Sequence, residues 1–187
     1  MRIISGISRG TKLYTLEGEN TRPTLDRVKE PLFSIIQAYI KDSVVLDLFE
    51  GSGALGLEAL SRGAKKAVLC DKSYEAVNII KKNIEKTHNQ KKTQVLCMDY
   101  KKCLNTVDEK FDLIFIDPPY KLDIAVKAIQ LILENDLLYG EGILIIETDY
   151  ENRELLEIRK LNYDIKIIDV RTYGRVKLIF LKKEERG

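Results

Sequence analysis

Asp47-Leu48-Phe49-Glu50-Gly51-Ser52-Gly53-Ala54-Leu55-Gly56 contains the pattern G-x-G-x-x-G, with its glycines at positions 51, 53 and 56. The apolar run that leads into it, residues 44–49, predicts a buried strand. Leu55, Leu57 and Leu60, which follow, have the spacing of a helix. A glycine loop between a strand and a helix is typical of an α/β sheet that binds a ligand at its carboxyl edge.

The rest of the chain repeats this alternation of apolar runs and amphipathic segments. Seven runs predict strands, at 44–49, 67–70, 94–98, 111–117, 142–147, 164–170 and 176–181. Near-continuous apolar strands joined by helices predict a mostly parallel sheet covered on both faces. The last two runs are linked only by 171–175, which is too short for a parallel crossover, so they predict an antiparallel hairpin.

The composition fits one compact domain. The chain has 187 residues, of which 44% are hydrophobic and 32% charged, which is enough for a buried core. It has no apolar run of about 18 residues and no signal-peptide pattern at its start, so a membrane partner and secretion are disfavoured and a cytoplasmic location is expected. The three cysteines, Cys70, Cys97 and Cys103, predict reduced thiols rather than a disulfide scaffold or a zinc site.

Upstream of the first apolar run, the pattern predicts two small elements. Residues 2–15 predict a β-hairpin that turns near its glycines. Residues 24–40 predict a helix with Thr24 as its N-cap and a kink at Pro31.

The first part of the chain also differs from the rest in charge. Residues 1–30 hold six bases and four acids, whereas the remainder has 25 of each. We therefore expect an N-terminal extension over 1–40, packed on a main domain over 41–187. Its basic surface could meet a polyanion, but six charges in thirty residues are also common on an ordinary solvated surface.

Acidic residues surround the glycine loop. Asp71 ends the second predicted strand, 20 residues after Gly51, where a carboxylate can reach the paired hydroxyls of a ribose. Asp47 and Glu50 would repel a pyrophosphate at the helix N-terminus, so the loop favours an adenosine cofactor with positive charge, such as S-adenosylmethionine. Candidate cofactor contacts are Asp47, Glu50, Gly51, Ser52, Gly53, Asp71 and Asp99.

Two of these acids have an alternative interpretation. Asp99 follows the third predicted strand and is placed to accept a hydrogen bond from an adenine amino group, but it is equally well placed to cap a helix that starts at Lys101. Asp71 could likewise be a helix cap, with the glycines serving only close packing.

The fourth predicted strand ends in the catalytic candidates Asp117, Pro118, Pro119 and Tyr120. Two successive prolines stiffen the loop, so the Asp117 carboxylate and the Pro118 carbonyl can be held as two acceptors aimed at one point. Two such acceptors suit an exocyclic amine, and Tyr120 offers a ring on which an extruded base could stack. The alternative is a strand-to-helix turn made rigid by its prolines.

The sequence resembles the class I S-adenosylmethionine-dependent methyltransferases, and within them the RsmD family of bacterial 16S rRNA guanine-N2 methyltransferases. The shared motifs are Met1–Gly6, Arg9-Gly10, Arg22-Pro23-Thr24, Arg27–Glu30, Leu46–Phe49, Gly51–Gly56, Glu58–Ala64, Asp117–Tyr120 and Tyr173-Gly174. Glu50, where relatives are expected to have a small residue, and Pro31, inside the first helix, depart from the family pattern.

This resemblance implies a Rossmann-like fold and S-adenosylmethionine as cofactor, with the target guanine contacted by Asp117, Pro118 and Tyr120. It implies 16S ribosomal RNA, or a particle of the assembling small subunit, as partner, faced by Arg9, Arg22, Thr24 and Arg27. No metal is needed, and a monomer is expected.

Three other interpretations remain open. The glycine loop and its spacing to Asp71 also fit an NAD-dependent oxidoreductase, and an adenine N6 amine would satisfy the same two acceptors as guanine. An RNA-binding module without activity would not need the acids at positions 47, 71, 99 and 117. His88 is interpreted as a C-terminal cap or surface residue, and Lys81, Lys82, Lys91 and Lys92 as solvated faces.

Overall fold

A computed structural model describes residues 1–16, 23–49, 51–118, 122–149, 151–161 and 163–184. Its seven-stranded sheet has the order β3-β2-β1-β4-β5-β7-β6. The strands are β1 (Val44–Leu48), β2 (Lys66–Asp71), β3 (Thr93–Cys97), β4 (Phe111–Ile116), β5 (Leu138–Thr148), β6 (Ile165–Tyr173) and β7 (Val176–Lys183). The pairs among β1 to β5 are parallel, and β7 is antiparallel to both of its neighbours. The predicted mixed sheet with a C-terminal antiparallel hairpin is therefore confirmed.

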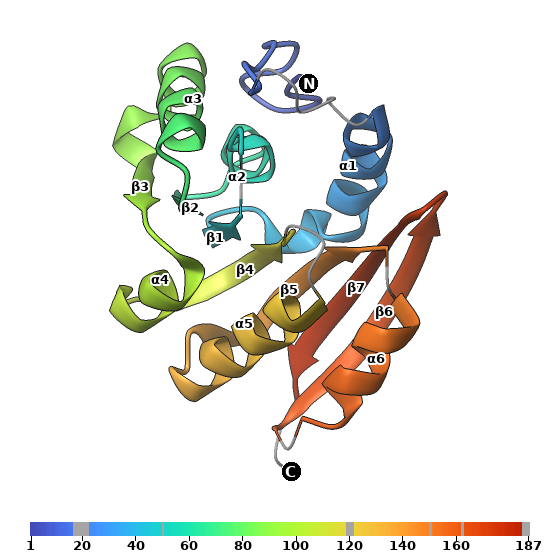
Figure 1. The fold of residues 1–187 in the computed structure, drawn as a ribbon. Helices are drawn as coiled ribbons and strands as arrows, with labels where there is room; N and C mark the ends of the chain where they lie inside the picture. Colours follow the sequence, from blue (N-terminus) through green and yellow to red (C-terminus); the bar gives the residue numbers. More distant parts are fainter. Residues whose placement is uncertain (17–22, 50, 119–121, 150, 162, 185–187) are drawn as a thin grey trace.

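The helices cover the sheet in two layers (Figure 1). They are α1 (Pro23–Ile35), α2 (Ala54–Ser61), α3 (Tyr74–Lys86), α4 (Tyr100–Thr106), α5 (Leu122–Glu134) and α6 (Glu151–Arg159), with short 3-10 turns at Gln37–Tyr39 and Gln90–Lys92. Helices α1 to α3 lie on one face, and α4 to α6 lie on the other.

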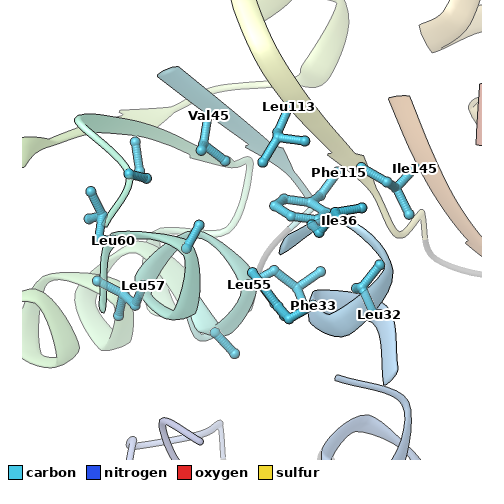
Figure 2. Close-up of a cluster of buried hydrophobic side chains, with 14 of the residues drawn as sticks. Leu32, Phe33, Ile36, Val45, Leu55, Leu57, Leu60, Leu113, Phe115 and Ile145 are labelled. Carbon is cyan, nitrogen blue, oxygen red and sulfur yellow. The ribbon is translucent and has the colours of Figure 1, made fainter. Parts of the chain in front are cut away.

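Alternate residues of each central strand point into the two layers, as strand geometry requires. In β4, Leu113 and Phe115 join the core under α1 and α2, whereas Ile114 and Ile116 join the core under α4 to α6. Figure 2 shows Phe33 of α1 and Ile36, the residue after α1, packed beside Phe115. The rings of Phe33 and Phe115 have their centroids 5.8 Å apart. Both faces are therefore apolar, which explains the near-continuous apolar runs of the sequence.

The N-terminal segment, residues 1–16, covers α2 on the side away from the sheet (Figure 1). Its two arms are joined by an antiparallel bridge between Arg2 and Lys12, and the Leu13 N–H donates to the Met1 carbonyl at 3.0 Å. Every residue of α2 is buried as a result. This arrangement explains why α2 is apolar nearly all round.

Two elements predicted upstream of β1 need correction. The first helix begins at Pro23, so Thr24 lies inside it rather than before it, and it ends at Ile35 rather than continuing to Ile40. It runs through Pro31, which the sequence placed at a kink. The predicted hairpin over 2–15 has two arms that turn over residues 5–10, but they form a single bridge and a few backbone hydrogen bonds rather than regular strands.

The C-terminal strands are longer than the apolar runs predict. β5 begins at Leu138 and β6 continues to Tyr173, so the hairpin turn consists of Gly174 and Arg175 alone. Gly174 has a φ of 65°, a left-handed conformation that favours glycine. The apolar runs therefore predict the buried parts of these strands but not their exposed ends.

Candidate active site at the carboxyl edge of the sheet

The glycine loop has the backbone shape that the motif requires. Phe49 has a φ of 68°, and Gly53, at the N-cap of α2, has a φ of 77°. The Phe49 N–H donates to the Cys70 carbonyl at 3.1 Å, which fixes the start of the loop against β2. These left-handed residues at the two ends of the loop turn the chain from β1 into α2. Because the loop follows β1 directly, it lies at the carboxyl edge of the sheet.

Asp47 of β1 connects the strand before this loop to the helix after it. Its side chain is fully buried, and its Oδ2 accepts a hydrogen bond of 2.7 Å from the Gly56 N–H in the first turn of α2. Helix N-termini carry N–H groups without partners in the helix, and an ionised acceptor there is favourable. Asp47, predicted to contact a cofactor, thus has an observed contact with α2, the helix that follows the loop.

Gly56 is needed for close packing rather than for its backbone conformation. A Cβ at this position would lie 2.3 Å from Leu69 Cδ2 and 3.3 Å from Asp47 Oδ2. The third glycine of the motif therefore lets α2 lie directly on β2. Gly51 and Ser52 lie in the loop itself, Ser52 being buried, while Glu50 lies outside the described residues.

Strand register places the ends of β1, β2 and β4 side by side. Leu48 of β1 pairs with Cys70 of β2 and with Ile116 of β4. The residues that follow these three, Phe49, Asp71 and Asp117, therefore share one edge.

Asp71 is half-buried where β2 ends, as predicted. Its Oδ1 accepts a hydrogen bond of 2.7 Å from the Ser73 N–H, and Ser73 rather than Asp71 is the N-cap of α3. Burial raises the pKa of Asp71, and the Ser73 and Lys72 N–H groups oppose that rise. Asp71 therefore has an observed role in the turn and remains placed at the edge for a ligand.

The structure shows the capping interaction of Asp99. Its Oδ1 accepts a hydrogen bond of 2.9 Å from the Lys101 N–H at the start of α4. The next residue, Tyr100, is buried, and its ring lies 5.1 Å from that of Phe49, measured between centroids. Burial raises the pKa of Tyr100, and the nearby Asp99 raises it further.

The Phe49–Tyr100 ring pair joins the start of the glycine loop to the segment that follows β3. Neither ring was predicted as a site residue, although Phe49 belongs to the shared motif Leu46–Phe49. The only signal available was an aromatic at each of two strand ends, which is common in a buried core.

The predicted catalytic segment follows β4 directly. β4 ends at Ile116, and Asp117 and Pro118 are both half-buried at the carboxyl edge. Pro119 and Tyr120 lie outside the described residues. The structure thus places the first two catalytic candidates beside the glycine loop.

The predicted RNA-facing residues are distributed unevenly. Arg9 and Arg27 are exposed, Arg22 lies outside the described residues, and nothing is described of the Thr24 side chain. Arg9 belongs to a turn that packs on the C-terminal ends of α2 and α3, since the Ile7 N–H donates to the Ser61 carbonyl at 2.9 Å and Ser8 Oγ donates to the Thr87 carbonyl at 3.4 Å.

One base of the N-terminal region is not at the surface. Lys29 is fully buried, and its Nζ lies 3.3 Å from Glu58 Oε2 of α2 and donates to the Arg2 carbonyl. The count of six bases in residues 1–30 therefore overstates the charge available to a polyanion.

Asn83 connects the N-terminal segment to the glycine loop. Its Oδ1 accepts from the Tyr14 N–H at 2.7 Å, and its Nδ2 donates to the carbonyls of Tyr14 and Ser52 at 2.9 and 2.8 Å. The side chain is fully buried in α3. No sequence pattern predicts this role, because an asparagine among the lysines and isoleucines of a helix is common on a partly exposed helix.

The remaining predicted features concern cysteines, metals and membranes. Cys70, Cys97 and Cys103 are free thiols. Within the described ranges, no cluster of three His, Cys, Asp or Glu side chains could hold a metal ion. None of the described helices is long and apolar enough to cross a bilayer.

Comparisons with known proteins agree with this geometry. The sequence model of the family described as "Conserved hypothetical protein 95" matches residues 1–182. The chain is similar to the ribosomal RNA small subunit methyltransferase D of Haemophilus influenzae, with 40% identity over 152 residues that cover 80% of this chain and 79% of the relative. Its similarity to the protein of the same name from Escherichia coli strain K12 is 36% over 154 residues, or 81% and 76% of the two chains.

A solved structure extends the similarity to the full chain. The candidate methyltransferase yhhF from Escherichia coli superposes with a TM-score of 0.84 at 29% sequence identity, covering 100% of this chain and 99% of that one. The predicted Rossmann-like methyltransferase fold is thus confirmed. The chain belongs to the family described as conserved hypothetical protein 95, the RsmD-type methyltransferases that its motifs resemble.

Proposed function

We propose that this protein transfers a methyl group from S-adenosylmethionine to the exocyclic N2 amine of a guanine in 16S ribosomal RNA. The observation that carries the proposal is the strand register, which sets Asp117 and Pro118 at the end of β4 next to the glycine loop at the end of β1. Support for RNA comes from the relatives named ribosomal RNA small subunit methyltransferase D.

The cofactor is S-adenosylmethionine, and the described residues fit its chemistry. Gly53 at the N-cap of α2 adds no side chain to the loop, and Asp71 and Asp99 are acceptors at the ends of β2 and β3. Carboxylates suit the ribose hydroxyls, the amino groups and the positive charge of this molecule, and they disfavour a pyrophosphate. The family membership likewise favours methyl transfer over the hydride transfer of an oxidoreductase.

Asp117 and Pro118 act on the amine. S-adenosylmethionine supplies an electrophilic methyl group on its sulfonium. The Asp117 carboxylate and the Pro118 carbonyl accept the two N–H bonds of the guanine amine, which directs its nitrogen lone pair away from them. These acceptors also stabilise the positive charge that grows on the nitrogen as it becomes tetrahedral. Asp117 is positioned mainly as an acceptor. When the nitrogen gains the methyl group, the C–S bond of the sulfonium would break to leave S-adenosylhomocysteine, and the proton then passes from the nitrogen to water.

Two side-chain groups complete the proposed site. Tyr120 stacks on the extruded guanine, as aromatic side chains do with flipped bases. Arg9, Arg22, Thr24 and Arg27 face the RNA, and the exposed position of Arg9 and Arg27 supports that assignment. The N-terminal extension over residues 1–40 contacts the RNA, and residues 41–187 form the methyl-transfer domain.

Substitution of Asp117 tests the mechanism. Asp117→Ala is expected to lower turnover at least about a hundredfold, as the loss of one preorganised electrostatic contact does, while the Kd for S-adenosylhomocysteine stays near wild type. Asp108→Ala removes an exposed acid on the loop before β4 and serves as the control. Retention of most turnover by Asp117→Ala would exclude the proposed role.

The methylated base is identified on RNA from cells that lack the protein. Purified enzyme is incubated with this RNA and tritiated S-adenosylmethionine, and the nucleosides are separated after digestion. Label in N2-methylguanosine from the small-subunit RNA is the expected result. Label in N6-methyladenosine would instead show that the two acceptors take an adenine amine.

A further inference from the structure

We propose that the N-terminal segment and the outer face of α3 form one continuous basic surface that binds the RNA backbone around the target nucleotide. This surface, called the basic surface below, consists of Arg2, Arg9, Lys12, Lys81, Lys82 and Lys86. The inference rests on the proposed function and extends it, because it adds α3 to an RNA site that the sequence motifs placed only at the N-terminus.

The basic surface concentrates the positive charge of the protein. Residues 1–16 and α3 together hold six bases and two acids, Glu75 and Glu85, whereas the remainder of the chain has 25 bases and 27 acids. All six bases are exposed. The net charge of +2 for the whole chain therefore hides a positive region on a slightly negative body.

The bases of this surface are not compensated by acids. Within the described part of the chain, none of the six takes part in an ion pair. The ion-paired bases lie elsewhere, for example Lys29 with Glu58, Lys66 with Glu109 and Lys182 with Glu141. Exposed bases without acidic partners are available to phosphates, whose contacts with Lys and Arg supply most sequence-independent affinity for nucleic acids.

Direct contacts join the two parts of the surface. Tyr14 exchanges two backbone hydrogen bonds with the Asn83 side chain of α3, and its ring lies 4.3 Å from Lys86 Nζ. Ser8 Oγ donates to the Thr87 carbonyl at the end of the same helix. Figure 1 shows the N-terminal segment beside α3. Lys82 is four residues before Lys86, so both lie on one side of the helix.

The basic surface leads to the proposed active site. Asn83, which joins the N-terminal segment to α3, also donates to the Ser52 carbonyl of the glycine loop. Tyr14 is 49% exposed, so its ring is available for a base to stack on. The basic surface therefore extends from the Arg9 turn to Tyr14, whose partner Asn83 is bonded to the glycine loop. These features favour RNA over an anionic membrane, which would bind the charges without needing a path to the loop.

The test compares two variants that each lose two positive charges. Lys82→Gln/Lys86→Gln alters the basic surface, and Lys127→Gln/Lys166→Gln removes exposed lysines from α5 and β6 as the matched control. With small-subunit RNA as substrate, the surface variant is expected to raise KM for RNA about tenfold and to change kcat less than twofold. Its Kd for S-adenosylhomocysteine should equal that of wild type.

The salt dependence of RNA binding provides a second readout. The slope of log Kd against log salt should fall by about 1–2 in the surface variant, because each lost phosphate contact reduces it by about 0.7–0.9. The control variant should keep the wild-type slope. Equal RNA affinity and slope in the two variants would overturn the proposal, and so would loss of binding to phosphatidylglycerol vesicles in the surface variant with RNA binding unchanged.

Failure of this inference is distinguishable from failure of the proposed function. If wild-type protein methylates the RNA and the surface variant behaves like its control, only the basic surface is refuted. If no methyl group is incorporated by wild type, but the surface variant loses salt-dependent RNA binding, the surface stands and the methyl transfer does not.

Discussion

Two buried glutamates lie on opposite faces of the sheet and have opposite surroundings. Glu58 of α2 is fully buried and lies 3.3 Å from Lys29 Nζ and 2.8 Å from Arg62 Nε. It also accepts from the N–H groups of Ile4 and Ser5 at 2.8 and 3.0 Å. Glu154 of α6 is 3% exposed, and its Oε2 has no hydrogen-bond partner among the described residues.

The lack of partners affects the ionisation of Glu154. Folding raises its pKa to about 7, mainly through burial; a hydrogen bond with Thr148 opposes the rise and the charge of Asp149 adds to it. Glu58 has two cations and two N–H donors to balance its burial. Glu58 thus joins α1, α2 and the N-terminal segment through compensated charge, whereas the charge of Glu154 would be buried without compensation.

The largest expected effect is that of Glu58→Gln. The substitution keeps the size of the side chain but leaves the Lys29 ammonium buried without a counter-charge. Breaking a buried pair in this way costs about 3–5 kcal/mol. Urea unfolding followed by circular dichroism should show this loss in the free energy of unfolding.

An exposed glutamate provides the control for that measurement. Glu30→Gln, on α1 next to Lys29, should change the free energy of unfolding by less than about 0.5 kcal/mol. If Glu58→Gln were as stable as Glu30→Gln, the cluster would not hold the N-terminal segment on α2.

The sequence predicted the sheet but not this cluster. An apolar run predicts each strand. The short link between the last two runs, before Val176, predicts an antiparallel hairpin. The acid at the end of β2 also follows from its spacing to the glycines. In contrast, although Glu58 and Arg62 have the i,i+4 spacing of a helical pair, the approach of Lys29 to Glu58 depends on how α1, α2 and the start of the chain pack together, which no local pattern predicts.

The candidate site shows the same limit. The sequence predicted cofactor contacts for Asp47, Asp71 and Asp99 and offered the cap at Lys101 as an alternative for Asp99, which the structure shows, whereas the hydrogen bonds from Gly56 and Ser73 are seen only in the structure. Short acidic side chains at strand ends can cap helices and bind ligands with the same oxygens. Sequence patterns locate them but do not separate these two roles.

The second prediction concerns Glu154. Because its pKa is raised from 4.5 to about 7 by folding, its contribution to stability is fully present below pH 4.5 and is lost as the pH rises through 7. The loss amounts to up to about 3 kcal/mol above pH 8, since one pKa unit corresponds to about 1.4 kcal/mol. Glu154→Gln, which cannot ionise, should therefore be more stable than wild type at pH 8.5.

Unfolding at two pH values measures this effect. The stability difference between Glu154→Gln and wild type should increase from pH 5 to pH 8.5. A difference that is equal at both values would mean that Glu154 has an ordinary pKa and that its burial has no ionisation cost.

The smallest effect is expected for Arg62→Gln, which tests how the charge of Glu58 is shared. The Arg62 side chain is 15% exposed, and its guanidinium lies 4.9 Å from the centre of the Phe33 ring. Water reaches this pair, and Lys29 remains to balance Glu58, so the loss should be about 1 kcal/mol rather than the 3–5 kcal/mol of Glu58→Gln. Arg62→Lys should recover part of it, because an ammonium keeps the charge but not the planar contact with the ring. Urea unfolding of both variants checks this order, and a loss for Arg62→Gln as large as for Glu58→Gln would mean that Arg62, not Lys29, is the main partner of the buried carboxylate.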